Sequence, residues 1–168
     1  MKVTGLITEY NPFHSGHQYH IDEARRLTGA DAILVVMSGD FVQRGLPAIT
    51  DKYSRTRMAL TAGADAVIEL PLAAATGSAE YFASGAVQTL NACGCVTDLV
   101  YGCECDPPEL LTPIARLLSE EPDSFRAALL ENLRSGLSYP AARSLAIQKI
   151  LPDFGRILDL PNNILGIE

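Results

Sequence analysis

Apolar positions in the first half of the chain fall into short runs rich in β-branched residues, separated by stretches with helical spacing. Residues 2–8 and 32–38 are two such runs, and they predict strands. Between them, apolar residues recur at helical intervals over residues 16–27, and Gly29 follows where a glycine commonly ends a helix. The pattern predicts a strand, a helix and a second strand, which is the unit from which parallel sheets are built.

The same alternation continues along the chain. Two more helix–strand pairs are expected, residues 50–62 with 66–70 and residues 78–92 with 96–101. Thr50 or Asp51 can cap the first of these helices, and Pro71 stops the strand that follows it. Only helices are expected after the fourth strand, over residues 110–118, 124–133 and 140–150. This order predicts an α/β fold, a doubly wound parallel sheet with extra helices after the fourth strand.

Composition restricts the class of protein. The 168 residues are 48% hydrophobic and 20% charged, which suits one globular domain. Four cysteines are too few for a disulfide scaffold. The longest apolar run, residues 32–37, is far shorter than the roughly 18 residues of a membrane span. The amino terminus does not resemble a signal peptide, so a cytoplasmic protein without membrane association is expected.

Charge is distributed unevenly between the two parts of the chain. Residues 1–60 hold 7 Lys and Arg against 6 Asp and Glu, whereas residues 61–168 hold 6 against 14. The second part is therefore a poor surface for nucleic acid. Arg44, Lys52, Arg55 and Arg57 form the one basic cluster that could meet phosphates, although a solvated helix face explains it equally well.

The loop after the first predicted strand carries the main candidate chemistry. Ligands of open parallel sheets bind beyond the carboxyl ends of the strands. There the sequence His14-Ser15-Gly16-His17 runs directly into the first helix. Gly16 allows close approach of a ligand, the helix N-terminus attracts phosphate, and both imidazoles can donate to it. A zinc site that adds His20 is the weaker alternative, because no carboxylate is placed beside the three histidines.

The motif resembles the HxGH signature of the HIGH nucleotidyltransferase superfamily, which includes adenylyltransferases and class I aminoacyl-tRNA synthetases. Longer strings resemble the tRNA(Met) cytidine acetate ligase family: EYNPFHSGHQYHI, VVMSGDFVQRGLPAITDKYSRTRMAL, GADAVIELP, YGCE, GLSYPAAR and LPNNILGIE. The resemblance implies a Rossmann-like sheet of the HIGH type and a ligase that activates acetate with ATP, with Mg²⁺ accompanying the ATP. The acetyl group would then pass to N4 of the wobble cytidine of elongator tRNA(Met).

The resemblance also implies site residues. The catalytic pair would be His14 and His17, on the phosphates. Gly102 and Asn162 would touch the nucleotide, although a strand-to-loop turn and a helix cap explain these two residues without the family. The ATP-binding stretch would comprise Ile7, Thr8, Glu9, Tyr10, Asn11, Pro12, Phe13, His14, Ser15, Gly16, His17, Gln18, Tyr19 and His20.

Other polar residues are open to two interpretations. Asp40, after the second strand, either orients substrate or magnesium or is a turn aspartate. Three basic residues lie on the next helix, Lys52, Arg55 and Arg57, and any one of them could meet acetate, pyrophosphate or the tRNA backbone. The cysteines, at positions 93, 95, 103 and 105, are more consistent with buried small side chains than with a zinc site, because a strand separates the two pairs. No bound structural metal is expected.

Family members are longer than this chain, so residues 1–168 are expected to be one nucleotidyltransferase-like ATP-binding domain cut from a longer protein. The carboxy-terminal part of that protein would bind tRNA, and the fragment alone could be inactive. Two other functions remain open. One is a small-molecule adenylyl- or cytidylyltransferase of the same superfamily, and the other is a non-catalytic nucleotide- or RNA-binding module.

Overall fold

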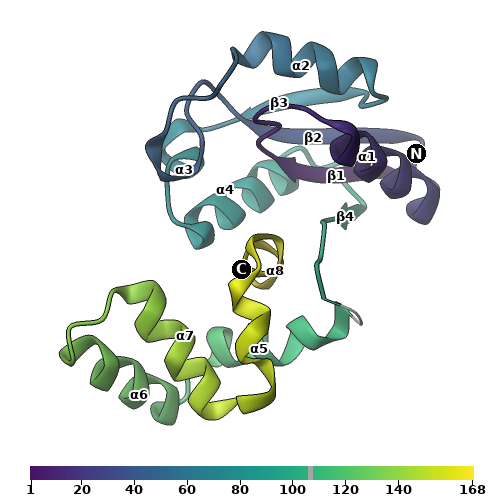
Figure 1. The fold of residues 1–168 in the computed structure, drawn as a ribbon. Helices are drawn as coiled ribbons and strands as arrows, with labels where there is room; N and C mark the ends of the chain where they lie inside the picture. Colours follow the sequence, from purple (N-terminus) through teal and green to yellow (C-terminus); the bar gives the residue numbers. More distant parts are fainter. Residues whose placement is uncertain (106–107) are drawn as a thin grey trace. The chain divides into compact units, whose positions relative to one another are not determined.

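The computed structural model describes residues 1–105 and 108–168, and it consists of two compact units, Met1–Tyr101 and Gly102–Glu168 (Figure 1). Each unit has its own cluster of buried hydrophobic side chains. The sequence predicted one domain over residues 1–168. The structure has two clusters of buried side chains, and chain length does not reveal this division. No helix of the described residues is long and apolar enough to cross a membrane.

The first unit is built on a four-stranded sheet. Its strands are β1 (Val3–Thr8), β2 (Ala32–Ser38), β3 (Ala66–Leu70) and β4 (Asp98–Val100). All pair in parallel, in the order β3-β2-β1-β4. The chain therefore proceeds outward from β1 to β3 and then returns to the other side of β1. Ligands of such sheets bind where this reversal occurs, at the carboxyl end of β1.

Helices cover both faces of this sheet, as the doubly wound prediction requires. On one face, α1 (Ser15–Thr28) and α2 (Lys52–Thr61) bury Ile21 and Ala59 in one cluster with Leu6 and Val35 of the sheet. On the other face, α4 (Ala79–Ala92) places Leu90 against Gly5, and Figure 1 shows α2 and α4 on opposite sides of the strands. The predicted fold class is confirmed.

A short helix that the sequence pattern did not predict, α3 (Leu72–Ala75), packs against α4. Their contact is close, because a Cβ built on Gly85 would lie 2.5 Å from Ala74 Cβ. Replacing Gly85 by alanine is therefore expected to lower the free energy of unfolding by about 1–3 kcal/mol through overpacking. An exposed helical glycine would instead gain up to about 1 kcal/mol from the same change.

Urea denaturation measures this effect, with Ser84→Ala as the matched control at the neighbouring exposed position. The control is expected to change stability by less than about 0.5 kcal/mol. A stabilised Gly85→Ala protein would contradict the close packing of α3 on α4.

The second unit is helical. Its three longest helices, α5 (Leu111–Glu120), α6 (Asp123–Arg134) and α7 (Tyr139–Ile150), agree with the prediction within two residues at each end. Three further elements were not predicted: two 3-10 helices (Pro108–Leu110 and Pro152–Asp159) and α8 (Pro161–Ile167). Buried Ile114, Phe125, Ile147 and Ile167 hold these elements together in one core.

Candidate active site

The histidines of the HxGH motif form the N-terminal cap of α1. His14 is the capping residue, and its Nδ1 accepts a hydrogen bond from the backbone N–H of Gly16 at 3.1 Å. His17 lies three positions later, and its Nδ1 accepts from the backbone N–H of His14 at 3.2 Å. This is a capping box in which imidazoles replace the usual hydroxyl and carboxylate or amide. The motif thus starts the helix as well as offering chemistry.

The capping box fixes the protonation pattern of both rings. Because each Nδ1 accepts a hydrogen bond, a neutral ring carries its proton on Nε2. The rings stack with centroids 3.7 Å apart and planes at 23°. Both Nε2–H groups are therefore donors on one stacked pair, located at the N-terminus of a 14-residue helix. Such an arrangement suits a phosphate, since helix dipole and imidazole donors act on the same anion.

Two aromatic residues from the preceding loop support the pair. Tyr10 is 1% exposed, adopts a positive φ of 49°, and places its ring 4.8 Å from those of Phe13 and His17. Burial raises the pKa of Tyr10 to about 12, against the opposing effect of the Thr8 side chain. The Phe13 ring lies 5.5 Å from that of His17. This packing limits the orientations open to His17.

The pKa of His17 is lowered to about 4, first by burial and then by the positive charges that His14 and His20 can carry. An unfolded chain takes up this proton near pH 6.5, so protonation favours unfolding between about pH 6.5 and 4. The free energy of unfolding is accordingly expected to fall as the pH is lowered through this window.

Urea denaturation at several pH values measures this dependence, with His17→Gln as the comparison. Glutamine is a usual residue at this position of a capping box but does not titrate, so the variant should lose part of the dependence. NMR titration of the His17 ring should give a midpoint near pH 4 and show the proton on Nε2. A midpoint near 6.5 would contradict the burial of this ring.

His20 lies one turn further along α1. Burial lowers its pKa, and the backbone of Val100 at the end of β4 opposes the shift. His20 therefore lies close to the strand beside β1. In the part of the chain that the structure describes, no three His, Cys, Asp or Glu side chains gather in a way that could hold a metal ion.

Arg55 fixes the loops at the carboxyl ends of β1 and β2. The residue is fully buried, although it belongs to α2. Its guanidinium donates to four backbone carbonyls, those of Glu9, Ser38, Gly39 and Thr50. Burial lowers its pKa, while nearby carboxylates oppose this shift. Arg55 was predicted as a possible substrate contact, but this placement favours a structural role.

Other polar residues of the predicted ATP-binding stretch also hold the loops. The Glu9 carboxylate accepts from the backbone N–H of Gln43 at 2.7 Å, and Asn11 Oδ1 accepts from that of Ile49 at 2.8 Å. Gln18 donates to the Ala62 carbonyl at 2.8 Å, whereas Tyr19 is 67% exposed. The side chains of Glu9, Asn11 and Gln18 therefore hold the loops, whereas the Nε2–H groups of the two histidines are not used by the capping box.

Lys52 and Asp40 lie together beyond β2 and β3. Lys52 Nζ is 2.8 Å from a carboxylate oxygen of Glu69 and 3.9 Å from one of Asp40. The Asp40 carboxylate also accepts from the backbone N–H of Lys52. These contacts raise the pKa of Lys52, the hydrogen bond to Glu69 most of all. Glu69 was not among the predicted site residues, and its place inside a strand gave no signal of this pairing.

In the second unit, Gly102 and Asn162 come together. A Cβ built on Gly102 would lie 4.0 Å from Asn162 Nδ2. Glu104 explains this proximity, since its carboxylate accepts from the Asn162 side chain at 2.8 Å and from the backbone N–H groups of Asn162 and Asn163. Buried Asn163 in turn accepts from the Glu104 backbone N–H at 2.8 Å. The strings YGCE and PNN are therefore two halves of one hydrogen-bonded structure.

The four cysteines divide between the two units, with Cys93 and Cys95 in the first and Cys103 and Cys105 in the second. Cys93 and Cys103 are half-buried and Cys95 is exposed, and none of the four is in a disulfide. Cys103 Sγ and Cys105 Sγ lie 3.0 Å apart, next to Asn163. The prediction that at least two of the cysteines are small buried side chains fits Cys93, Cys103 and Cys105 only partly, because these three are half-buried.

The whole chain, residues 1–168, matches the sequence profile described as HIGH Nucleotidyl Transferase. The chain belongs to the HIGH nucleotidyl transferase family. Family membership agrees with the geometry above, since the HxGH residues lie at the start of α1, beyond the central strand. The catalytic roles of His14 and His17 themselves stay predictions.

Relatives confirm the more specific resemblance. The chain is 54% identical over 171 residues to the tRNA(Met) cytidine acetate ligase of Acetivibrio thermocellus, covering 100% of this chain and 41% of that protein. It is 50% identical over 170 residues to the enzyme of the same name from Thermoanaerobacter sp., covering 100% and 42%. The chain thus spans less than half the length of these relatives.

A solved structure is also similar. Thermotoga maritima TmcAL, bound with alpha-thio ATP, superposes with a TM-score of 0.94 at 45% identity. The match covers 99% of this chain and 42% of that one. This likeness supports the predicted α/β fold class with its parallel sheet.

Proposed function

We propose that the protein activates acetate with ATP and transfers the acetyl group to N4 of the wobble cytidine of elongator tRNA(Met). The observation that carries this proposal is the stacked pair His14 and His17 at the N-terminus of α1, in which the capping box uses both Nδ1 atoms and leaves both Nε2–H groups as donors. The names of the similar enzymes, together with the ATP analogue bound by the Thermotoga protein, support the substrates. ATP, acetate and tRNA(Met) are accordingly proposed as partners in the cytoplasm.

In the first step, an acetate oxygen attacks the α-phosphorus of ATP, and the bond to pyrophosphate breaks. Negative charge grows on the phosphate oxygens, where His14 and His17 donate hydrogen bonds. Each such donor contributes about 3 kcal/mol to lowering the barrier. Mg²⁺ would supply further neutralisation of the pyrophosphate, held mainly by the phosphate oxygens. Asp40 is the candidate residue for contact with this ion.

In the second step, N4 of cytidine attacks the acetyl carbonyl, AMP leaves and the nitrogen loses a proton. Positioning is the main contribution asked of the protein, because acyl-adenylates are already reactive. The loops clamped by Arg55 provide a fixed frame for both steps. Nucleotide contacts of Gly102 and Asn162 stay predictions from the resemblance.

The experiment is ATP–pyrophosphate exchange in the full-length protein, with acetate, other small carboxylates or no acid, each with and without tRNA(Met). Exchange that requires acetate supports the proposal, and formation of N4-acetylcytidine completes it. Exchange that is indifferent to acetate would indicate a different nucleotidyltransferase. No exchange under any condition would indicate a binding module.

A further inference from the structure

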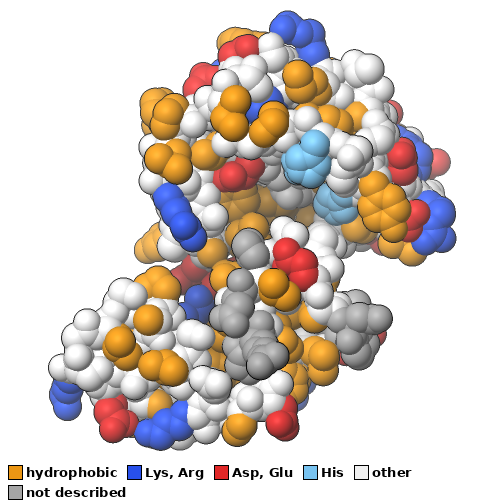
Figure 2. Space-filling model, viewed as in Figure 1, with side chains coloured by type: hydrophobic (Ala, Val, Ile, Leu, Met, Phe, Trp, Pro, Cys, Tyr) orange, Lys and Arg blue, Asp and Glu red, His pale blue; other side chains and the backbone are white. Residues whose placement is uncertain are grey.

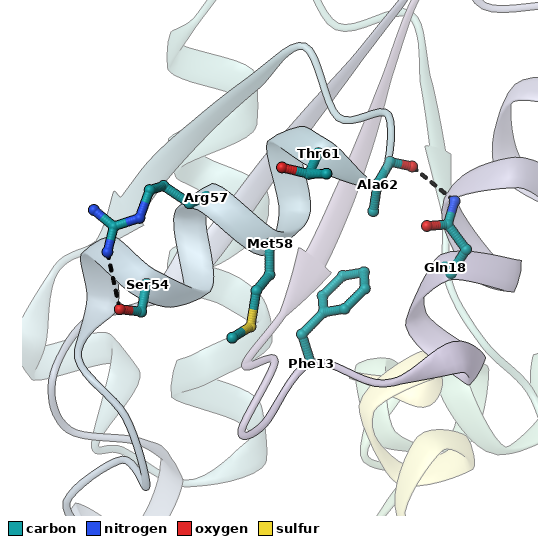
Figure 3. Close-up of a pocket in the computed structure, with 7 residues that line it drawn as sticks. All are labelled: Phe13, Gln18, Ser54, Arg57, Met58, Thr61 and Ala62. Carbon is teal, nitrogen blue, oxygen red and sulfur yellow. Dashed lines mark hydrogen bonds between the residues drawn. The ribbon is translucent and has the colours of Figure 1, made fainter.

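A groove of about 540 Å³ lies beside the HxGH loop, between the start of α1 and the outer side of α2 (Figure 3). Phe13 forms one wall and Met58 lies opposite it in the close-up. Arg57 marks one end, and Gln18 lies at the other, next to Ala62. The remaining lining residues are Ser54 and Thr61. All of these residues belong to the first unit, so the groove is formed within it.

The apolar side chains that line the groove are accessible to solvent. Met58 is 44% exposed, and the half-buried Phe13 ring lies between the groove and His17, 5.5 Å from the latter ring. Figure 2 shows hydrophobic side chains beside the histidines on this face of the first unit. An apolar groove of this kind suits a planar ring, which can stack on the aromatic side chain of Phe13.

Arg57 brings a positive charge to one end of the groove, where the Asp51 carboxylate accepts a hydrogen bond from Ser54 Oγ at 2.7 Å. Arg57 is exposed and donates to Ser54 Oγ at 3.1 Å. Its charge also contributes to lowering the pKa of Asp51, which caps α2. No carboxylate is among the residues that line the groove in the described part of the chain. A planar ring with a phosphate attached would therefore match both ends of this surface. Aromatic stacking combined with an Arg–phosphate contact is how proteins hold unpaired nucleotides of RNA.

We propose that this groove binds the acceptor nucleotide of the RNA, with its base on Phe13 and Met58 and a neighbouring phosphate on Arg57. The inference rests on the proposed function, because acetyl transfer requires the acceptor amine to reach an adenylate held at His14 and His17. One aromatic ring separates the groove from His17, so the acceptor is adjacent to the reacting phosphate without occupying the same space.

The test compares Arg57→Ala and Met58→Glu with Arg26→Ala in the full-length protein. Arg26 is an exposed arginine on α1, paired with Glu23, and it does not line the groove. Three quantities are measured for each protein: acetate-dependent pyrophosphate exchange, acetyl transfer to tRNA(Met), and binding of an anticodon stem-loop RNA. Exchange also reports whether each variant has folded.

Both groove variants should keep exchange within about 2-fold of the wild type and lose RNA binding and transfer by about 10-fold or more. Arg57→Ala should also reduce the slope of the logarithm of RNA affinity against the logarithm of salt concentration by about 1, as expected for the loss of one phosphate contact. Arg26→Ala should match the wild type. Unchanged RNA binding in both groove variants would overturn the proposal and favour a protein partner for the groove. Equal losses in Arg26→Ala would overturn it in favour of general charge attraction.

Failure of the proposed function is distinguishable from failure of this inference. If the wild-type protein shows no acetate-dependent exchange, the ligase proposal fails, while the RNA-binding comparison of the same variants still decides whether the groove holds RNA. A variant that loses exchange and RNA binding together would place the groove in the adenylation step or the fold, which contradicts an acceptor site.

Discussion

Replacing His14 by alanine is expected to reduce acetate-dependent ATP–pyrophosphate exchange by about 10²–10³-fold, because one of two imidazole donors to the phosphates is lost. The same change removes the cap of α1, which should lower the free energy of unfolding by about 1 kcal/mol. Exchange kinetics and urea denaturation measure the two effects on the same protein.

The variant His14→Asn separates the loss of exchange from the loss of the helix cap. Asparagine is a good N-cap residue and its side-chain oxygen can accept from the Gly16 N–H, but its shorter side chain places its NH2 donors short of the position of Nε2. His14→Asn is therefore expected to be as stable as the wild type and as inactive as His14→Ala. A His14→Asn protein that retains exchange would show that His14 acts only through the helix cap.

The largest loss of stability is expected at Arg55. Replacing it by methionine keeps most of the buried apolar volume but leaves four backbone carbonyls without their donor. Each unsatisfied buried carbonyl costs roughly 1–3 kcal/mol, with partial relief by water, so the free energy of unfolding should fall by about 3 kcal/mol or more. Urea denaturation measures this loss.

Arg57→Met is the matched control, two residues along the same helix. Arg57 is exposed, and the change should alter stability by less than about 0.5 kcal/mol. Arg55→Lys should recover little, because one ammonium has three donors and lacks the planar fork that reaches several carbonyls. Equal losses of stability in Arg55→Met and Arg57→Met would contradict the structural role of the four Arg55 hydrogen bonds.

Much of the first unit could be predicted because its pattern is periodic. β2 and β3 begin and end where the apolar runs do, and α1 ends at Gly29 in the left-handed conformation. β4 is shorter than the predicted residues 96–101, since only Asp98–Val100 pair with β1. α3 and α8 were missed because helices of four and seven residues depend on tertiary packing rather than on their own periodicity.

The sequence predicted where the candidate site lies, but not the directions of its side chains or their hydrogen bonds. A loop after the first strand, with two histidines at a helix start, follows from topology and spacing. That Arg55 points inward and Arg57 outward does not, because α2 has a weak apolar pattern and both residues are equally polar in sequence. The pairing of Glu104 with Asn162 and Asn163 joins segments that lie almost sixty residues apart, which local patterns do not reveal.

The capping box has a consequence for how such a protein can diverge. Its two rings use Nδ1 to build the helix and keep Nε2 for the proposed phosphate contact, so a substitution can remove the second use and keep the first. Asparagine at position 14 or glutamine at position 17 would leave a folded, inert descendant. Arg55 has no comparable substitute, because even lysine would recover little of its hydrogen bonding. Gene copies released from selection for turnover would therefore lose catalysis by single steps while keeping this loop framework.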